Sequence, residues 1–268
     1  MDDTIRAVGL GLAALFAIHG SLAQRARHGA EHQTRESFNN TGHVHVQFQP
    51  RGVLGLEASD FWAVDVYGDD IKTDRLPFYV YPREGWKGSI RHLRLHFKRF
   101  TLAGLPIRAF EADIPFATFD IGHALYKSRL VLRGAGSGPA TVAVDAEGLK
   151  IFIARKFRNS LNDVTVQFVN KRIIIEGKAT LFSSVSSIST TGILVPAEGR
   201  YLMLAEPEIR INGVLLTSQS AAVLLKQFNP VLDAEKDLGL GGYFEMEGVE
   251  VKADEIVITG HATIPISK

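Results

Sequence analysis

The sequence predicts an α+β fold dominated by antiparallel sheet, and two observations lead to this prediction. Residues 164–181 read as an alternating strand and its returning partner, and residues 249–264 repeat the pattern with a tighter turn. Alternation places every second side chain on one face of a strand. Each hairpin also follows a segment with apolar residues at helical spacing. We therefore expect a helix–hairpin unit present twice, within a long, curved antiparallel sheet wrapped around two amphipathic helices.

The composition excludes several classes of protein. A chain of 268 residues suits one large domain. Its hydrophobic fraction of 46% and charged fraction of 22% are ordinary for a globular protein. The net charge of +1 argues against nucleic acid as the main partner. The sequence contains no cysteine, so disulfides, thiolate metal sites and cysteine nucleophiles are excluded.

The N-terminus carries the only long apolar run, over residues 7–23. Its length and its small residues at the end are typical of a signal peptide. Two aspartates precede the run and two arginines follow it, which is the reverse of the usual charge order for export. A signal peptide or membrane anchor over residues 1–23 and an amphipathic, surface-lying helix both stay open. We expect a polar linker over residues 24–42 and a single domain over residues 43–268.

Alternation predicts the strands along the chain, and proline and glycine mark their ends. The prolines around residues 78–81 favour a strand at a sheet edge. A glycine-rich turn separates the last two strands before residue 145. Strands are predicted at residues 43–48, 61–67, 78–81, 90–98, 110–114, 129–133, 141–144, 180–196 and 200–212, with a short helix at 120–126.

Two amphipathic helices are predicted from capping residues and spacing. Asp145 is placed as the N-cap of the first helix, and Thr217 or Ser218 as that of the second. Pro230 disfavours helical geometry at the residue before it and should end the second helix. The apolar stripes are Leu149, Phe152, Ile153, Phe157 and Leu161 in the first helix, and Ala221, Leu224, Leu225 and Phe228 in the second.

The side chains on the apolar face of each returning strand become smaller toward the end of the strand. These apolar faces run from branched residues to Gly177 and Ala179 in one copy, and to Gly260 and Ala262 in the other. A glycine inside a strand weakens it unless a backbone, a helix or a ligand approaches closely. Packing by a helix is the favoured interpretation, and direct contact with a ligand is the alternative.

Several segments resemble a known family. The order of Phe228-Asn-Pro-Val-Leu-Asp233, Gly248-Val-Glu-Val251 and Glu255-Ile-Val-Ile-Thr-Gly260 is similar to the C-terminal end of the LmeA-like phospholipid-binding family of bacterial envelope proteins. Gly88-Ser-Ile-Arg-His-Leu-Arg-Leu95 and Ala140-Thr-Val-Ala-Val-Asp145 also look like that family's opening strand and first helix start. The resemblance covers residues 86–264. Where members usually carry a Leu/Pro-rich approach to the last hairpin, residues 239–242 read Gly-Leu-Gly-Gly.

The resemblance implies a tubular-lipid-binding-like (TULIP-like) architecture, in which acyl chains lodge between a bent sheet and the helices. It also implies a phospholipid or other acyl lipid as partner, and a location in the periplasm or cell envelope. The protein could be anchored there through its N-terminus, and the cytoplasmic face stays an alternative. The residues that we expect to line the lipid are Leu93, Leu95, Phe97, Phe110, Leu149, Phe152, Ile153, Phe157, Ile173, Ile175, Leu224, Leu225, Phe228, Ile256 and Ile258.

Charge is unevenly distributed along the chain. Cations outnumber anions over residues 83–178, and anions dominate over residues 233–255. A basic region is attracted to anionic headgroups, by about 1 kcal/mol per Lys or Arg near the surface. An ordinary solvated face is the alternative. The residues expected to face the membrane or the headgroups are Arg91, Arg94, Lys98, Lys150, Arg155 and Arg158.

Signatures of catalysis are missing from the sequence. It has no P-loop, no Gly-x-Ser-x-Gly elbow and no His-Glu-x-x-His run. We therefore expect a non-enzymatic protein without catalytic residues, metal or cofactor, and without a nucleic-acid partner. A structural or adaptor protein with a filled core is the main rival. An enzyme acting on a lipid-linked substrate is a third alternative, with His92, His96 and Asp120 as candidate residues.

Overall fold

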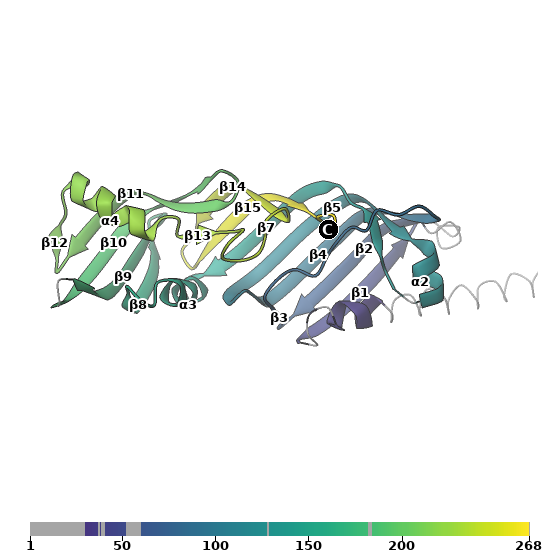
Figure 1. The fold of residues 1–268 in the computed structure, drawn as a ribbon, viewed down its shortest axis with the longest axis horizontal. Coiled ribbons are helices and arrows are strands. Elements are labelled where there is room, and N and C mark those ends of the chain that lie inside the picture. Colours follow the sequence, from purple (N-terminus) through teal and green to yellow (C-terminus); the bar gives the residue numbers. More distant parts are fainter. Residues whose placement is uncertain are drawn as a thin grey trace, which may run out of the picture.

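The computed structural model of the chain describes residues 30–36, 38, 41–51, 60–127, 129–181 and 184–267. The molecule is elongated, and two sheets lie one after the other along its length (Figure 1). It consists mainly of strands, with a few helices and a curled, mostly antiparallel sheet. This agrees with the predicted α+β class.

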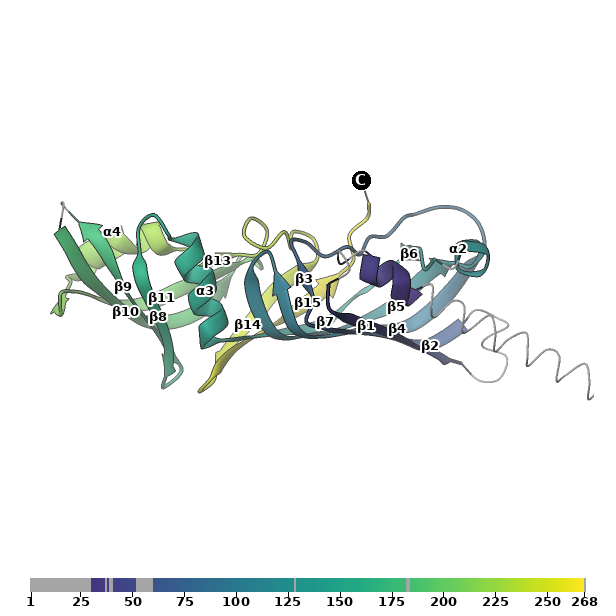
Figure 2. The same ribbon diagram turned by 90° about the horizontal axis from the view of Figure 1, so that it is seen from below.

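The large sheet contains nine strands: β1 (His43–Pro50), β2 (Asp60–Asp69), β3 (Lys72–Thr73), β4 (Lys87–Leu102), β5 (Leu105–Asp120), β6 (Leu132–Gly134), β7 (Ser137–Asp145), β14 (Phe244–Val251) and β15 (Glu255–Thr263). Its main order is β1-β2-β4-β5-β7-β15-β14. Strand β4 pairs in parallel with β2 and β3, and the other pairs are antiparallel. The sheet curves along its length (Figure 2).

The small sheet contains six strands: β8 (Asn162–Val169), β9 (Arg172–Leu181), β10 (Ser184–Ala197), β11 (Tyr201–Ile211), β12 (Val214–Leu215) and β13 (Leu232–Asp233). Its order is β12-β11-β10-β9-β8, and β13 pairs with β11. The Met246 N–H donates to the Gly199 carbonyl at 2.6 Å and so joins the two sheets.

Three helices have defined bounds: α2 (Ile121–Lys127), α3 (Ala146–Lys156) and α4 (Ser218–Phe228). The predicted caps are confirmed. The Asp145 carboxylate accepts the Gly148 N–H at 2.7 Å, and the Thr217 hydroxyl accepts the Ser220 N–H at 3.4 Å. Helix α3 ends earlier than its apolar stripe suggests, so Phe157 and Leu161 lie in the turn after it.

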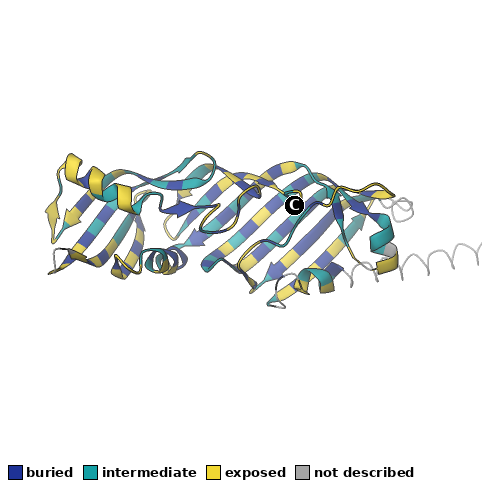
Figure 3. Ribbon diagram, viewed as in Figure 1, coloured by how far each residue is buried: buried dark blue, intermediate teal, exposed yellow. Residues whose placement is uncertain are grey.

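The core follows the alternation that the sequence shows. Leu93, Leu95 and Phe97 on β4 are buried, while the residues between them are partly or fully exposed. The same alternation appears as bands across both sheets (Figure 3). The buried residues form one continuous apolar cluster that spans both sheets, because the inner faces of the strands and helix α3 all turn toward the same interior.

Two strand predictions differ from the structure. The two similar hairpins belong to different sheets, because β8–β9 lies in the small sheet and β14–β15 in the large one. Residues 78–81 form no strand. Only Val80 makes a bridge, to Leu132 and Ile266, because this segment crosses between other elements instead of lying along an edge.

The segment expected to be a linker contributes to the core where it is described. Residues 30–36 are helical, and Phe38 is fully buried. The Phe38 ring meets Phe97 and Phe78 edge to face, with ring centroids 5.6 and 5.8 Å apart. Burial of one large aromatic ring stabilises the fold enough to hold this segment against the core, even though its other residues are mostly polar. The apolar run at residues 7–23 lies outside the described residues. Within the described part of the chain, no helix has the length and apolar character to span a bilayer.

Candidate functional site

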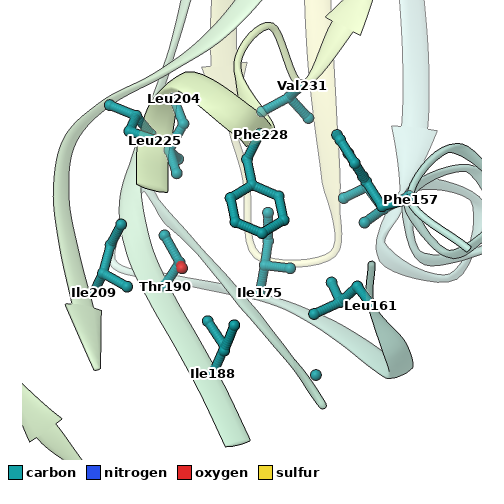
Figure 4. Close-up of a pocket in the computed structure, with 12 residues that line it drawn as sticks. Phe157, Leu161, Ile175, Ile188, Thr190, Leu204, Ile209, Leu225, Phe228 and Val231 are labelled. Atoms are coloured by element: carbon teal, nitrogen blue, oxygen red, sulfur yellow. The ribbon is translucent and has the colours of Figure 1, made fainter. Parts of the chain in front are cut away.

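An apolar slot lies between helix α4, the end of α3 and the inner face of the small sheet (Figure 4). Its lining is aliphatic and aromatic, and Thr190 contributes the only hydroxyl group. The slot is lined by Ile153, Phe157, Leu161, Ile175, Gly177, Ile188, Thr190, Leu204, Ile209, Leu225, Phe228 and Val231. We call this the helix slot.

Secondary structure explains why these side chains meet. Ile175 and Gly177 lie on the same face of β9, two residues apart, as alternation requires. Leu225 and Phe228 are three residues apart on α4 and therefore share one face of the helix. The strand face and the helix face point toward each other, so apolar groups line both walls.

The helix slot is nearly closed. Its cavity volume is about 30 Å³, which is roughly the volume of one water molecule in the liquid. The ring of Phe228 reaches from α4 into the slot (Figure 4) and meets Phe157 edge to face, with centroids 5.5 Å apart. A larger ligand can enter only if α4 or these rings move.

Helix α4 is loosely packed, which bears on whether it can move. Ala221 is its only buried residue, and Leu224, Leu225 and Phe228 are half-buried. Val223 is 61% exposed. Segments with few buried apolar contacts open at a lower free energy than the core. The wall of the helix slot formed by α4 is therefore the one that moves most easily.

The C-terminal end of α4 is held firmly. The Asn229 side chain accepts the Leu204 N–H and donates to the Leu204 carbonyl, both at 2.9 Å. Lys156 donates to the Pro230 and Val231 carbonyls and pairs with Asp237 at 2.6 Å. The other end of α4 follows the two-residue edge strand β12. Both ends of α4 are therefore connected to β11.

A second apolar hollow, which we call the middle hollow, adjoins the slot. Its cavity volume is also about 30 Å³. Helix α3 lies between the two spaces, because its Leu149 lines the middle hollow and its Ile153 lines the slot. On β11, Leu202 lines the middle hollow and Leu204 lines the slot. The middle hollow is lined by Leu76, Phe100, Leu102, Leu105, Ile107, Phe110, Val142, Val144, Leu149, Leu202, Leu232, Ala234, Leu238, Leu240, Phe244, Met246, Ile256 and Ile258.

The segment before β14 closes the middle hollow. Tyr243 is buried there, and its hydroxyl donates to the Leu76 carbonyl at 3.0 Å. Burial, with a smaller contribution from the neighbouring Tyr79, raises the pKa of the Tyr243 hydroxyl far above its ordinary value. A third hollow, of about 180 Å³, lies under residues 30–34 and includes Leu93 and Tyr79 in its lining.

The structure distributes the expected lipid-lining residues among these spaces. The helix slot receives Ile153, Phe157, Ile175, Leu225 and Phe228. Phe110, Leu149, Ile256 and Ile258 line the middle hollow, and Leu93 lines the third. The remaining five pack elsewhere in or against the core and line none of the three: Leu95, Phe97, Phe152, Ile173 and Leu224.

Sequence reasoning missed other walls of the slot. The stripe predicted for the first helix includes Leu161, but this residue follows the turn after α3 and reaches the slot from there. Ile188, Leu204 and Ile209 lie on β10 and β11, where only long strands were predicted. Their alternation with polar residues could have identified the inward-facing positions.

Glycine positions have structural partners. A methyl group added at Gly177 would lie 2.8 Å from the Leu161 side chain, and one at Gly260 would lie 2.0 Å from the Glu245 carbonyl oxygen. Both glycines therefore allow a close approach within the protein. This favours close packing within the protein over direct contact with a ligand. The packing partner is not a helix in either case: it is the segment after α3 at Gly177 and the backbone of β14 at Gly260.

Of the six cations expected to face headgroups, three lie on the outer face of β4 and two, Lys150 and Arg155, lie on α3, while Arg158 lies in the turn after that helix. Arg94 lies 3.5 Å from Asp65, and Lys150 lies 3.0 Å from Glu147. The Arg91 guanidinium lies 5.7 Å from the Trp62 ring centroid, and Arg155 lies 5.6 Å from that of Phe152. Lys98 and Arg158 are exposed.

The candidate catalytic residues pack against or pair with neighbouring side chains, and His96 also lines an open hollow of about 510 Å³ beside β1 and β2. His92 lies 3.1 Å from Asp113, and the His96 ring stacks on Tyr67 with centroids 5.1 Å apart. His92 pairs with Pro115 on β5. Asp120 lies five residues further along β5, at a distance of roughly 16 Å. The structure does not bring these three residues together at one centre.

Asp120 has a clear structural task at the start of α2. Its carboxylate accepts the His123 N–H at 2.9 Å and pairs with the buried Arg133. The His123 backbone hydrogen bond, followed by the bond from Arg133, holds the pKa of Asp120 well below its ordinary value.

Among the described residues, no group of three or more His, Asp or Glu side chains is arranged to hold a metal ion. Comparison of the chain with protein-family models, curated proteins and solved structures finds no match.

Proposed function

We propose that the protein binds an acyl-chain lipid without catalysing a reaction, and that the helix slot receives the chain. The single observation that carries this proposal is the pairing of an apolar slot with a loosely packed helix as its cover. The resemblance of the C-terminal segments to LmeA-like proteins supports the same function. It extends the proposal to a TULIP-like architecture with a repeated helix–hairpin unit, and to phospholipid held or transferred at a bacterial envelope.

The energetics suit a carrier that opens on binding. Moving the partly buried Leu225 and Phe228 into water costs at most about 1.5–3 kcal/mol for each side chain. Each methylene of an acyl chain that leaves water gains about 0.8 kcal/mol. A chain segment of roughly four to eight methylenes therefore offsets the opening. A chain taken from a bilayer has already left water, so it gains little of this energy, and contacts with the slot lining must offset the opening. Binding from a bilayer is therefore weak and exchangeable.

The chemistry of the lining also favours a chain over a polar ligand. Thr190 is 9% exposed and is the one lining residue with a side-chain hydroxyl. A charged or strongly hydrogen-bonding group would lose water there without finding partners. A hydrocarbon chain has no hydrogen bonds with water to lose, and many small dispersion contacts suffice to hold it.

A specific observation favours the rival function, a structural or adaptor protein with a filled core. The slot and the middle hollow each hold only about 30 Å³, whereas ligand pockets usually reach about 300–1,000 Å³. The two functions differ in one respect: a carrier must open at α4, and a filled core stays closed.

Native mass spectrometry of the protein incubated with phospholipid tests the proposal. We expect a one-to-one lipid adduct on the native protein. Leu225→Trp fills the slot and should remove the adduct. Gln227→Trp, at an exposed position of the same helix that does not line the slot, is the matched control and should keep it. An adduct that is missing from the native protein, or unaffected by Leu225→Trp, contradicts binding in the slot.

A further inference from the structure

Most of the exposed apolar residues differ in kind between the two halves of the molecule, apart from Ile151 on α3 and Ile266 beside Val80. Among the described residues, the large exposed aromatic side chains all lie between residues 62 and 126, in the large-sheet half. The end formed by the small sheet exposes aliphatic side chains instead. These are Val169, Val185, Val214, Leu215 and Val223, with exposed fractions of 43%, 70%, 68%, 53% and 61%.

Four of these residues lie at the free end of the small sheet, and we call them the apolar tip: Val185, Val214, Leu215 and Val223. Val214 and Leu215 form the edge strand β12, and α4 begins three residues later. The Ser187 N–H donates to the Asn212 side chain at 2.9 Å, which brings the start of β10 to the turn before β12. Exposed positions cover α4 and β12 at this end (Figure 3).

The apolar tip adjoins the helix slot. Ile209 lines the slot, and its carbonyl accepts the N–H of Leu216, the residue after β12, at 2.9 Å. Helix α4 supplies both surfaces, since Val223 faces out and Leu225 faces the slot. The apolar tip and the helix slot are therefore adjacent, and they are formed in part by the same helix.

Charge around the tip identifies the kind of partner. Residues 209–232 contain Arg210 and Lys226 but no Asp or Glu, in a chain that has 29 acidic residues. Both cations are exposed, and neither has an ion pair with another described residue. Apolar residues flanked by unpaired cations match the surface of an anionic bilayer, where aliphatic groups enter the acyl boundary and cations meet the headgroups.

We propose that the apolar tip inserts into an anionic phospholipid bilayer and is the mouth through which a chain reaches the helix slot. This inference rests on the proposed function, because a mouth has a purpose only if the slot takes a chain. It assigns the membrane contact to the α4–β12 end, away from the cations on β4 and α3.

Tryptophan quenching by brominated lipid tests the contact. The native tryptophans, Trp62 and Trp86, both lie in the large-sheet half and report on the other end. In the full chain, Val223→Trp places a third tryptophan at the tip. Glu250→Trp, at an exposed position on β14, is the control. Vesicles of phosphatidylcholine and phosphatidylglycerol, with and without bromine on the acyl chains, serve as the probe.

We expect Val223→Trp to lose most of its added emission in brominated vesicles, and Glu250→Trp to lose none. If the Val223→Trp emission is quenched no more than that of the native protein, the inference is overturned. Leu215→Trp provides a second reporter if circular dichroism shows that the first variant does not fold.

Uptake measured separately distinguishes the two proposals. A soluble fluorescent fatty acid reaches the helix slot without a bilayer. Quenching at the tip without fatty-acid uptake would contradict the proposed function and leave the membrane contact standing. Uptake without quenching at the tip would remove the membrane contact alone.

Discussion

Phe157 and Phe228 meet edge to face across the helix slot, with ring centroids 5.5 Å apart and an angle of 63° between the planes. The first residue follows α3 and the second ends α4, so this contact joins the two helices. It also fills the space that an acyl chain would occupy. The pair therefore keeps the slot closed in the absence of a ligand, and the predictions below follow from that relationship.

Phe228→Leu should bind acyl chains more readily than the native protein. The smaller side chain removes the aromatic contact and enlarges the slot. An aromatic pair contributes about 0.5–1.5 kcal/mol beyond its buried area, so we expect the free energy of unfolding to fall by about that amount. Stopped-flow uptake of a fluorescent fatty acid, together with urea unfolding, measures both effects. A less stable variant with unchanged uptake would show that this ring does not close the slot.

Asn229→Ala should loosen α4 without removing any residue that lines the slot. The substitution removes two hydrogen bonds to Leu204 and leaves partly buried backbone groups unpaired, at a cost of about 1–3 kcal/mol. Hydrogen exchange should accelerate in residues 218–228. Faster exchange throughout the small sheet would instead show that Asn229 supports the whole sheet. Asn229→Asp keeps the acceptor but loses the donor, and should show a smaller increase than the alanine variant.

Ile175→Asn should weaken acyl binding by about tenfold, because this partly buried branched side chain contributes at most about 1.5–3 kcal/mol. Ile174→Asn is the matched control, since the neighbouring residue on β9 faces the other side of the sheet. Fatty-acid titration of the folded fraction measures the difference. Equal losses in both variants would point to a general loss of stability. Phe152 is a poorer probe, because it is buried without lining any of the three hollows.

Asp120→Asn should remove a pH-dependent contribution to stability. The pKa of Asp120 is lowered in the folded protein, below the unfolded value of about 3.9. Its stabilisation is therefore fully present above that value and is lost as the pH falls below about 4. The native protein should be more stable than Asp120→Asn at pH 7, and the gap should narrow in acid. Chemical unfolding across this range measures the gap, with the exposed Glu250→Gln as control. A gap that stays constant below pH 4 would contradict this role.

Local signals made the elements of this fold predictable. Asp145 and Thr217 are capping residues placed before apolar stripes, and both cap helices in the structure. Alternation identified the inward faces of β4 and β15, where Leu95 and Ile258 are buried. These signals are local because a cap or an alternating pattern involves only a few consecutive residues.

Contacts between distant segments were beyond such reasoning. Phe38 is a single aromatic residue in a polar stretch, and only the fold brings it to Phe78 and Phe97. The hairpin β14–β15 resembles β8–β9 in pattern, but pairing with β7 places it in the large sheet. The volume of the helix slot depends on how closely Phe228 approaches Phe157, and this distance has no periodic signature.

Photo-crosslinking with a diazirine-labelled fatty acid tests the central claim most directly, because it records where the chain lies. The predicted result is covalent label on the peptides that line the helix slot, in residues 153–161, 175–190 and 225–231, with labelling reduced by Leu225→Trp. Label confined to exposed surfaces, or none above background, would contradict the claim that the slot holds an acyl chain.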